Sequence, residues 1–237
     1  MCRLKAKIIV PSVFLILISL FLFFSGNQVK LPIEIKEKVK DYAIGNIIED
    51  NNEYLVVLTG SRWKKFGNEI IIFSLEDKKE IYREDFSEFN PWKVITGDID
   101  GDGKDEISIG VYKKSPFHQV MAKRPFIYSF EHGKLEPKWR GSRLARPFID
   151  YNFYDIDGDN VEEIISVEIL ENNRNVINTY KWKGFGFEGY LESKDYENIK
   201  ELTIEDGEAH IQVREGKETY LGLVKLKGNN LIIEREN

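Results

Sequence analysis

The sequence predicts an all-β fold made of repeated, strand-rich units. Short apolar runs with aromatic and β-branched residues alternate with turn signals through residues 42–237, and no amphipathic helical pattern interrupts them. An acidic loop also occurs twice, starting at Asp98 and at Asp155, 57 residues apart. That interval fits one four-stranded unit per repeat, so about four such units account for the folded region.

The expected strands follow from the apolar runs and from the turns between them. A degenerate unit begins near residues 50–57, one interval before the first acidic loop, and another begins near residues 204–207. The units predict a β-propeller-like array, with an incomplete propeller or a β-sandwich as alternatives that only ring closure distinguishes. The apolar runs predict strands at 54–59, 69–73, 92–96, 106–112, 126–130, 153–154, 163–169, 176–182, 209–213, 220–226 and 230–234.

The two acidic loops carry the same pattern of oxygen ligands. Carboxylates occupy loop positions 1, 3, 5 and 9, and Gly103 or Asn160 at position 6 tolerates the left-handed backbone that bends the chain. Calcium takes about six to eight oxygens, and alternate side chains of a curled loop can direct several of them to one centre. With the backbone carbonyl at position 7, the predicted ligands are Asp98, Asp100, Asp102, Lys104 and Glu106 in the first loop, and Asp155, Asp157, Asp159, Val161 and Glu163 in the second.

Two other interpretations of these loops fit the residues less well. An EF-hand needs a glutamate at position 12, where Ile109 and Ser166 stand, and helices rather than strands around the loop. Asp-Gly turns also connect hairpins without binding a metal. However, four acidic side chains crowded into one loop repel one another unless a cation neutralises them, and here that crowding occurs twice. The pattern therefore favours two calcium sites.

The loops resemble the FG-GAP repeats of integrin α subunits and related bacterial repeats. The resemblance is carried by residues 98–110 and 155–167. In those repeats the calcium loop joins neighbouring strands of a β-propeller blade. The resemblance thus implies a calcium-binding β-propeller of the bacterial, membrane-anchored type, in which the ligands named above hold the ions.

The N-terminal part of the chain differs in character from the rest. Residues 8–24 are almost entirely apolar and follow three basic residues, which is typical of a signal peptide or a signal anchor. The run exceeds a usual signal-peptide core and lacks small residues at its end, so an uncleaved hydrophobic helix is favoured over secretion after cleavage. We expect a single-pass membrane protein with an anchor at residues 1–26, a spacer at 27–41 and an extracytoplasmic FG-GAP-like propeller domain at 42–237.

Residues 110–146 are strongly basic, although the chain as a whole is acidic. The segment contains nine Lys or Arg and two Glu, whereas the net charge of the chain is −6. Such segregation is typical of an interaction surface, and guanidinium groups bind carboxylate or phosphate bidentately. We therefore predict that Arg124, Trp139, Arg140, Arg143 and Arg146 form a site for an anionic ligand. The alternative is that these arginines neutralise the acidic blades or face solvent.

The motifs favour a binding or adhesion module over an enzyme. We find no Ser-His-Asp order, metalloprotease motif, phosphate-binding glycine loop or cysteine-nucleophile motif in the sequence. The acidic balance and the expected location argue against nucleic acid. The expected partners are an anionic envelope polymer, an acidic glycan or a protein, with the membrane held through the N-terminal segment. An enzyme acting on an acidic envelope glycan and a scaffold for another membrane protein are the alternatives. Trp63, Trp92, Trp182 and Phe185 are expected to fill blade interiors.

Overall fold

The computed structural model describes residues 31–141 and 143–236. The predicted anchor at residues 1–26 and the first part of the spacer lie outside the described residues. The fold below is that of the compact unit Ile35–Asn237. Within the described ranges, we find no helix with the length and apolarity needed to cross a bilayer.

Four antiparallel sheets of four strands each make up the described part of this unit. Blade 1 contains β1 (Val39–Gly45), β2 (Tyr54–Thr59), β3 (Glu69–Ser74) and β4 (Lys79–Asp85), and blade 2 contains β5 (Pro91–Gly97), β6 (Glu106–Ser115), β7 (His118–Glu131) and β8 (Lys134–Trp139). Blade 3 contains β9 (Phe148–Tyr154), β10 (Glu163–Ile169), β11 (Asn175–Trp182) and β12 (Phe187–Glu192), and blade 4 contains β13 (Asn198–Glu205), β14 (Glu208–Glu215), β15 (Glu218–Lys227) and β16 (Asn230–Arg235).

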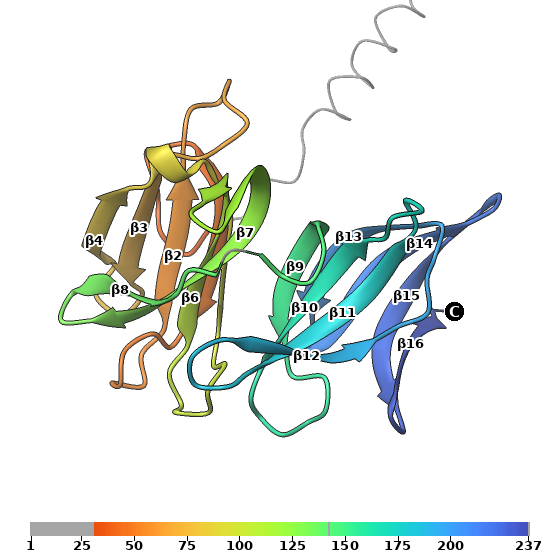
Figure 1. Cartoon of the computed structure of the whole chain (residues 1–237). Helices are drawn as coiled ribbons and strands as arrows, with labels where there is room; N and C mark the ends of the chain where they lie inside the picture. The colour runs from red at the N-terminus through yellow and green to blue at the C-terminus, as the bar shows by residue number, and fades with distance from the viewer. Residues whose placement is uncertain (1–30, 142, 237) are drawn as a thin grey trace, which may run out of the picture. The chain divides into compact units, whose positions relative to one another are not determined.

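The four sheets are arranged as the blades of a β-propeller. Each sheet is a meander in which neighbouring strands pair in chain order. Figure 1 shows the strands of the four sheets. The first strand of a blade packs against the first strand of the next, β1 against β5, β5 against β9 and β9 against β13. The predicted all-β fold of about four blade units is confirmed.

The strands that the apolar runs missed are mainly the exposed ones. The outer strands β4 and β12 are largely solvent-exposed, so their sequences show no apolar run. By contrast, β2 is buried at all six positions, and β10 is buried at all but its last residue. A strand covered on both faces reads as a continuous apolar run, which is why the inner strands were predictable.

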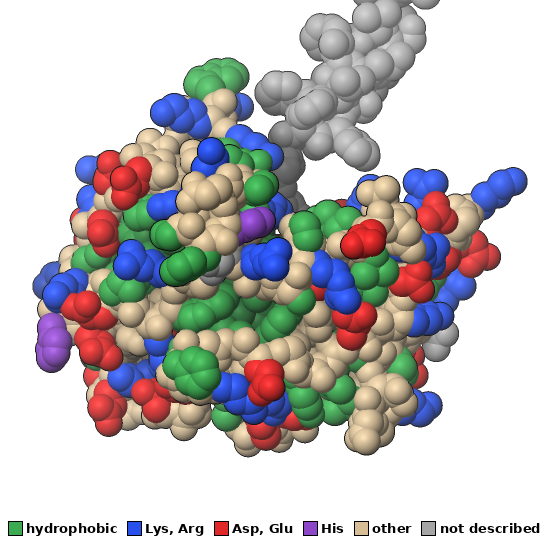
Figure 2. Space-filling view, viewed as in Figure 1, with side chains coloured by type: hydrophobic (Ala, Val, Ile, Leu, Met, Phe, Trp, Pro, Cys, Tyr) green, Lys and Arg blue, Asp and Glu red, His purple; other side chains and the backbone are tan. Residues whose placement is uncertain are grey.

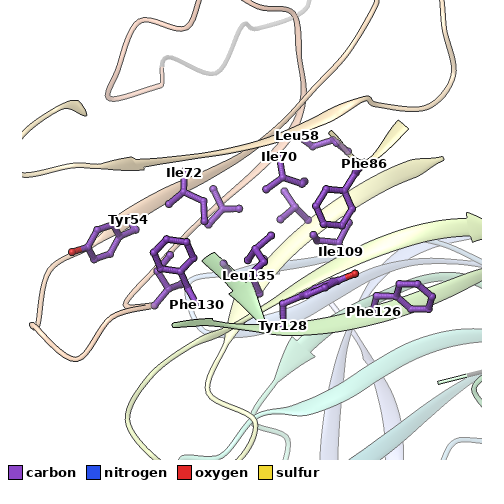
Figure 3. Packing of buried hydrophobic residues seen from close by; sticks show 14 of the residues in the cluster. Tyr54, Leu58, Ile70, Ile72, Phe86, Ile109, Phe126, Tyr128, Phe130 and Leu135 are labelled. Carbon is purple, nitrogen blue, oxygen red and sulfur yellow. The ribbon is translucent and has the colours of Figure 1, made fainter. Parts of the chain in front are cut away.

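Apolar side chains fill the spaces between successive blades. Leu58 and Ile72 of blade 1 belong to the same cluster as Ile109, Tyr128 and Phe130 of blade 2 (Figure 3). A second cluster joins blades 2 and 3, and a third joins blades 3 and 4. Burial of apolar area at about 25 cal/mol per Å² holds such stacked sheets together.

The four aromatic residues expected inside the blades divide into two pairs. Trp92 and Trp182 pack against the cluster between blades 2 and 3, as expected. The expectation was wrong for Trp63 and Phe185, whose relative exposures are 89% and 88%. Both occupy tips of strand connections, where no second sheet is available to cover them.

Candidate metal centres and the adjoining pocket

Each acidic loop joins the first strand of its blade to the second. The Asp98 carboxylate accepts hydrogen bonds from the backbone N–H groups of Gly101 and Gly103, at 2.7 and 2.8 Å. Asp155 does the same in the second loop, with Gly158 at 2.7 Å and Asn160 at 2.9 Å. These bonds curl the backbone around the first carboxylate of each loop.

The residue at loop position 6 has the backbone conformation that the sequence predicts. Gly103 has φ +85°, and Asn160 has φ 64°. Position 4 is also left-handed in both loops, with φ +77° at Gly101 and at Gly158. The two copies therefore share one backbone shape, since glycine and asparagine accept this region most readily.

In each loop three carboxylates converge. Carboxylate oxygens of Asp98, Asp100 and Glu106 lie within 4.8 Å of one another, and so do those of Asp155, Asp157 and Glu163. Glu106 and Glu163, the first residues of β6 and β10, are buried beneath the loops. Burial raises the pKa of Glu106 to about 7 and also raises the pKa of Glu163.

The other predicted ligands lie in the same loops but outside these groups of three. Asp102 accepts a hydrogen bond from the N–H of Lys104 at 2.9 Å, and Asp159 accepts one from Val161 at 2.9 Å. Both carboxylates thus hold the second half of their own loop. Lys104 and Val161, whose carbonyls were predicted as ligands, follow the left-handed residue directly.

A lysine ammonium group contacts each group of carboxylates. Lys138 Nζ of β8 lies 2.5 Å from Asp100 Oδ2 and 2.5 Å from Glu106 Oε1. Lys181 Nζ of β11 lies 2.8 Å from Asp157 Oδ2 and 3.0 Å from Glu163 Oε1. Burial opposes the charge on both lysines, but the carboxylate hydrogen bonds outweigh it and raise the pKa of each. Sequence reasoning missed both lysines.

The residues of the loops fit a hard divalent cation. All converging donors are carboxylate oxygens, the ligands that calcium prefers. Asp157 Oδ1 is buried and has no hydrogen-bond partner among the described residues, so this carboxylate oxygen is available to a cation. A cation in the loop and the lysine ammonium would compete for the same oxygens, because both neutralise the same carboxylates.

The acid at loop position 8 attaches each loop to the preceding blade. Asp105 accepts a hydrogen bond from Asn46 N at 2.9 Å and donates its own N–H to Asn46 O at 2.8 Å. Glu162 donates its N–H to Asp98 O at 2.8 Å, so the second loop is bonded to the first residue of the first. Burial and nearby Asp105 raise the pKa of Glu162 to about 7. The sequence offers a signal for this contact, because loop position 8 is acidic in both copies and directly precedes the acidic position 9.

The five residues predicted to bind an anion do not form one site. Arg124 is fully buried, and its guanidinium donates to the carbonyls of Lys113, His118 and Val120 at 2.8 to 3.1 Å. Arg124 therefore holds the β6–β7 hairpin together. The prediction that it contacts an anionic ligand does not agree with this burial. Arg146 pairs with acids of blade 3, as the alternative interpretation held.

Trp139 and Arg143 remain together at a pocket between blades 2 and 3. The Trp139 ring meets Phe187 edge-on at 5.1 Å, and Arg143 is exposed. Arg140 follows Trp139 directly and is exposed as well. The pocket has a volume of about 310 Å³ and is lined by Trp139, Arg143, Leu144, Ala145, Tyr180 and Phe187.

Known proteins match this chain by structure and not by sequence. No protein-family model and no curated protein matches the sequence. Among solved structures, the chain is similar to a Bacillus licheniformis rhamnogalacturonan lyase PL11, with 13% identity and a TM-score of 0.48. The match covers 83% of this chain and 48% of that structure, so the chain spans about half its length. The FG-GAP relationship therefore stays a resemblance of the two loops.

Proposed function

We propose that this protein is an extracytoplasmic β-propeller that binds two structural calcium ions and acts as an envelope binding module. The observation that supports it is the repeated geometry of the loops. In both, carboxylates at positions 1, 3 and 9 lie within 4.8 Å of one another on the same left-handed backbone. Hairpin turns need no such convergence, whereas a calcium ion does.

The calcium ions would stabilise the contact between blades. Each loop is hydrogen-bonded to the residue that follows the first strand of the preceding blade, Asn46 for the first loop and Asp98 for the second. An ion that orders the loop therefore also orders this contact. Because ligand binding to the folded state alone shifts unfolding by mass action, a calcium concentration of about 100 Kd adds about 2.7 kcal/mol per site.

Metal titration tests the calcium sites. The full chain, stripped with a chelator, is expected to take up two calcium ions, with a melting temperature that rises with calcium concentration. Asp100→Asn and Asp157→Asn are each expected to remove one ion, because each deletes one converging carboxylate. Asp206→Asn, in the β13–β14 turn, is the matched control and should keep both ions. Equal melting in calcium and in chelator, with no uptake, would refute the proposal.

For the ligand, we propose an acidic glycan held at the pocket between blades 2 and 3. Aromatic rings of Trp139 and Phe187 offer surfaces for a sugar ring, and Arg143 at the rim supplies a fork for a carboxylate. Arg140 adds a second exposed cation beside Trp139. A glycan with carboxylates matches both features, whereas a simple anion would use only the arginines.

Charge reversal at the pocket tests the ligand proposal. The double variant Arg140→Glu and Arg143→Glu is expected to weaken binding of a uronic-acid oligosaccharide at least tenfold, because each replaces attraction by repulsion. Arg214→Glu, an exposed arginine of β14, is the control and should bind like the wild type. Unchanged affinity in the double variant, with an unchanged melting temperature, would exclude this pocket. Turnover of the oligosaccharide would instead favour the glycan-acting enzyme.

A further inference from the structure

Two neighbouring connections in blades 1 and 2 expose apolar side chains to solvent. We name them the loop-tip surface, defined as residues 61–66 between β2 and β3 together with residues 114–121 around the β6–β7 turn. Its exposed apolar side chains and their relative exposures are Trp63 at 89%, Phe117 at 93%, Val120 at 58% and Met121 at 40%. Exposure of this degree in two adjacent segments is characteristic of a docking surface.

The two segments lie side by side. Phe66 stacks on Tyr112 of β6, with ring centroids 5.6 Å apart and ring planes 12° from parallel. Burial lowers the pKa of Lys123 in β7, and repulsion from the nearby charge of Lys65 lowers it further. The β2–β3 loop and the β6–β7 turn project from the same end of their blades (Figure 1). Together they present one surface.

This surface is also basic. Arg62, Lys64, Lys65 and Lys114 are exposed, and neither segment contains an acidic residue. The Arg62 guanidinium lies 5.9 Å from the centroid of the Trp63 ring, so charge and aromatic surface are presented together. Figure 2 shows hydrophobic and basic side chains gathered over this end of the molecule. Such a combination suits a partner that has an anionic outer surface and an apolar interior.

The polypeptide enters blade 1 beside the loop-tip surface. Gly60 donates its N–H to Lys38 O at 3.0 Å, and Lys40 Nζ donates to Lys64 O at 2.6 Å. Fourteen residues separate the apolar run at 8–24 from β1. Such a segment spans at most about 50 Å when fully extended. A run inserted in a membrane would therefore keep this end of the propeller within reach of the bilayer.

We propose that the loop-tip surface docks on a bilayer containing anionic phospholipid. Trp63 and Phe117 lie at the boundary between headgroups and acyl chains, where aromatic residues are favoured, and the basic side chains contact phosphate groups. The exposed aliphatic Val120 and Met121 favour lipid over an anionic polymer, because a polymer in water gains nothing from them. This inference extends the membrane location that the sequence predicts and is independent of the calcium sites and of the glycan pocket.

Fluorescence quenching tests the docking on the full chain. The protein is incubated with phosphatidylcholine vesicles that carry brominated acyl chains, with or without phosphatidylglycerol. The contribution of Trp63, taken as the difference between wild type and Trp63→Phe, is expected to be quenched most in the anionic vesicles. A Phe117→Trp reporter should behave alike. Phe185→Trp, equally exposed on the β11–β12 turn, is the matched control and should not be quenched.

Charge removal gives a second readout. The triple variant Arg62→Gln, Lys64→Gln and Lys65→Gln is expected to lower vesicle affinity on the order of fivefold per charge, and added salt should reproduce the loss. Two results would overturn the inference. One is equal quenching of the Phe185→Trp control, which would mean insertion through residues 1–30 alone without docking. The other is a Trp63 response to a soluble polyanion but not to brominated lipid. Calcium uptake measured on the same variants distinguishes failure of docking from failure of the calcium sites.

Discussion

Lys181→Met is expected to destabilise the chelated protein by about 2 to 3 kcal/mol and to cost little when calcium is present. Lys181 Nζ contacts Asp157, Asp159 and Glu163 at 2.8 to 3.0 Å, and Glu163 is buried. Removing the ammonium leaves a buried carboxylate without a counter-charge. Calcium can then neutralise the same oxygens without competition, so the affinity of this loop for calcium should rise. Unfolding in urea, with chelator and with saturating calcium, measures both effects.

A nearby lysine provides the control for this experiment. Lys183, two residues along the chain, is exposed, and Lys183→Met should leave stability unchanged in either condition. Lys138→Met is expected to repeat the behaviour of Lys181→Met in the first loop, because Lys138 holds Asp100 and Glu106. An equal loss of stability with and without calcium would mean that lysine is the permanent cation of these loops.

Arg146→Ala is expected to lower the free energy of unfolding by about 2 to 3 kcal/mol. The Arg146 guanidinium lies 3.3 Å from the carboxylate of Glu168, which has no solvent exposure. Asn178 and Tyr180 also donate hydrogen bonds to Glu168, but neither carries a positive charge. The arginine is itself about a third exposed, so part of its charge is screened and the loss falls below that of a fully buried pair.

The double variant with Glu168→Gln separates charge from packing. Removing the buried charge as well should recover most of the stability lost in Arg146→Ala, because the remaining amide needs no counter-ion. Chemical denaturation of the wild type, both single variants and the double variant gives the coupling free energy between Arg146 and Glu168. If Arg146→Ala is as stable as the wild type, the pair is only a surface contact. Arg146 would then again be a candidate for binding an anionic ligand.

The basic segment at residues 110–146 shows which features of a site can be predicted from the sequence and which cannot. Clustering of arginines along the chain suggested one anion site, but Arg124 lies in β7, whereas the other three lie in the connection between β8 and β9. Arg124 is buried in its own hairpin, Arg146 contacts blade 3, and only Arg143 lines the pocket with Trp139. Similarly, an aromatic residue is expected in a core by default, but a local signal was present: Trp92 begins a predicted strand, whereas Trp63 lies between two predicted strands, next to Arg62 and Lys64.

The sequence alone determined the repeated units and the positions of the loop oxygens. Both depend on neighbours within one loop or strand, namely the spacing of carboxylates, the left-handed residue and the continuous apolar runs of buried strands. Only the tertiary structure decided which cation faces those oxygens and which basic and aromatic side chains share a surface. Lys138 reaches Asp100 across 38 positions of the chain, and Lys181 reaches Asp159 across 22. Such contacts arise from the pairing of strands within a blade and the packing of blades, which no local pattern specifies.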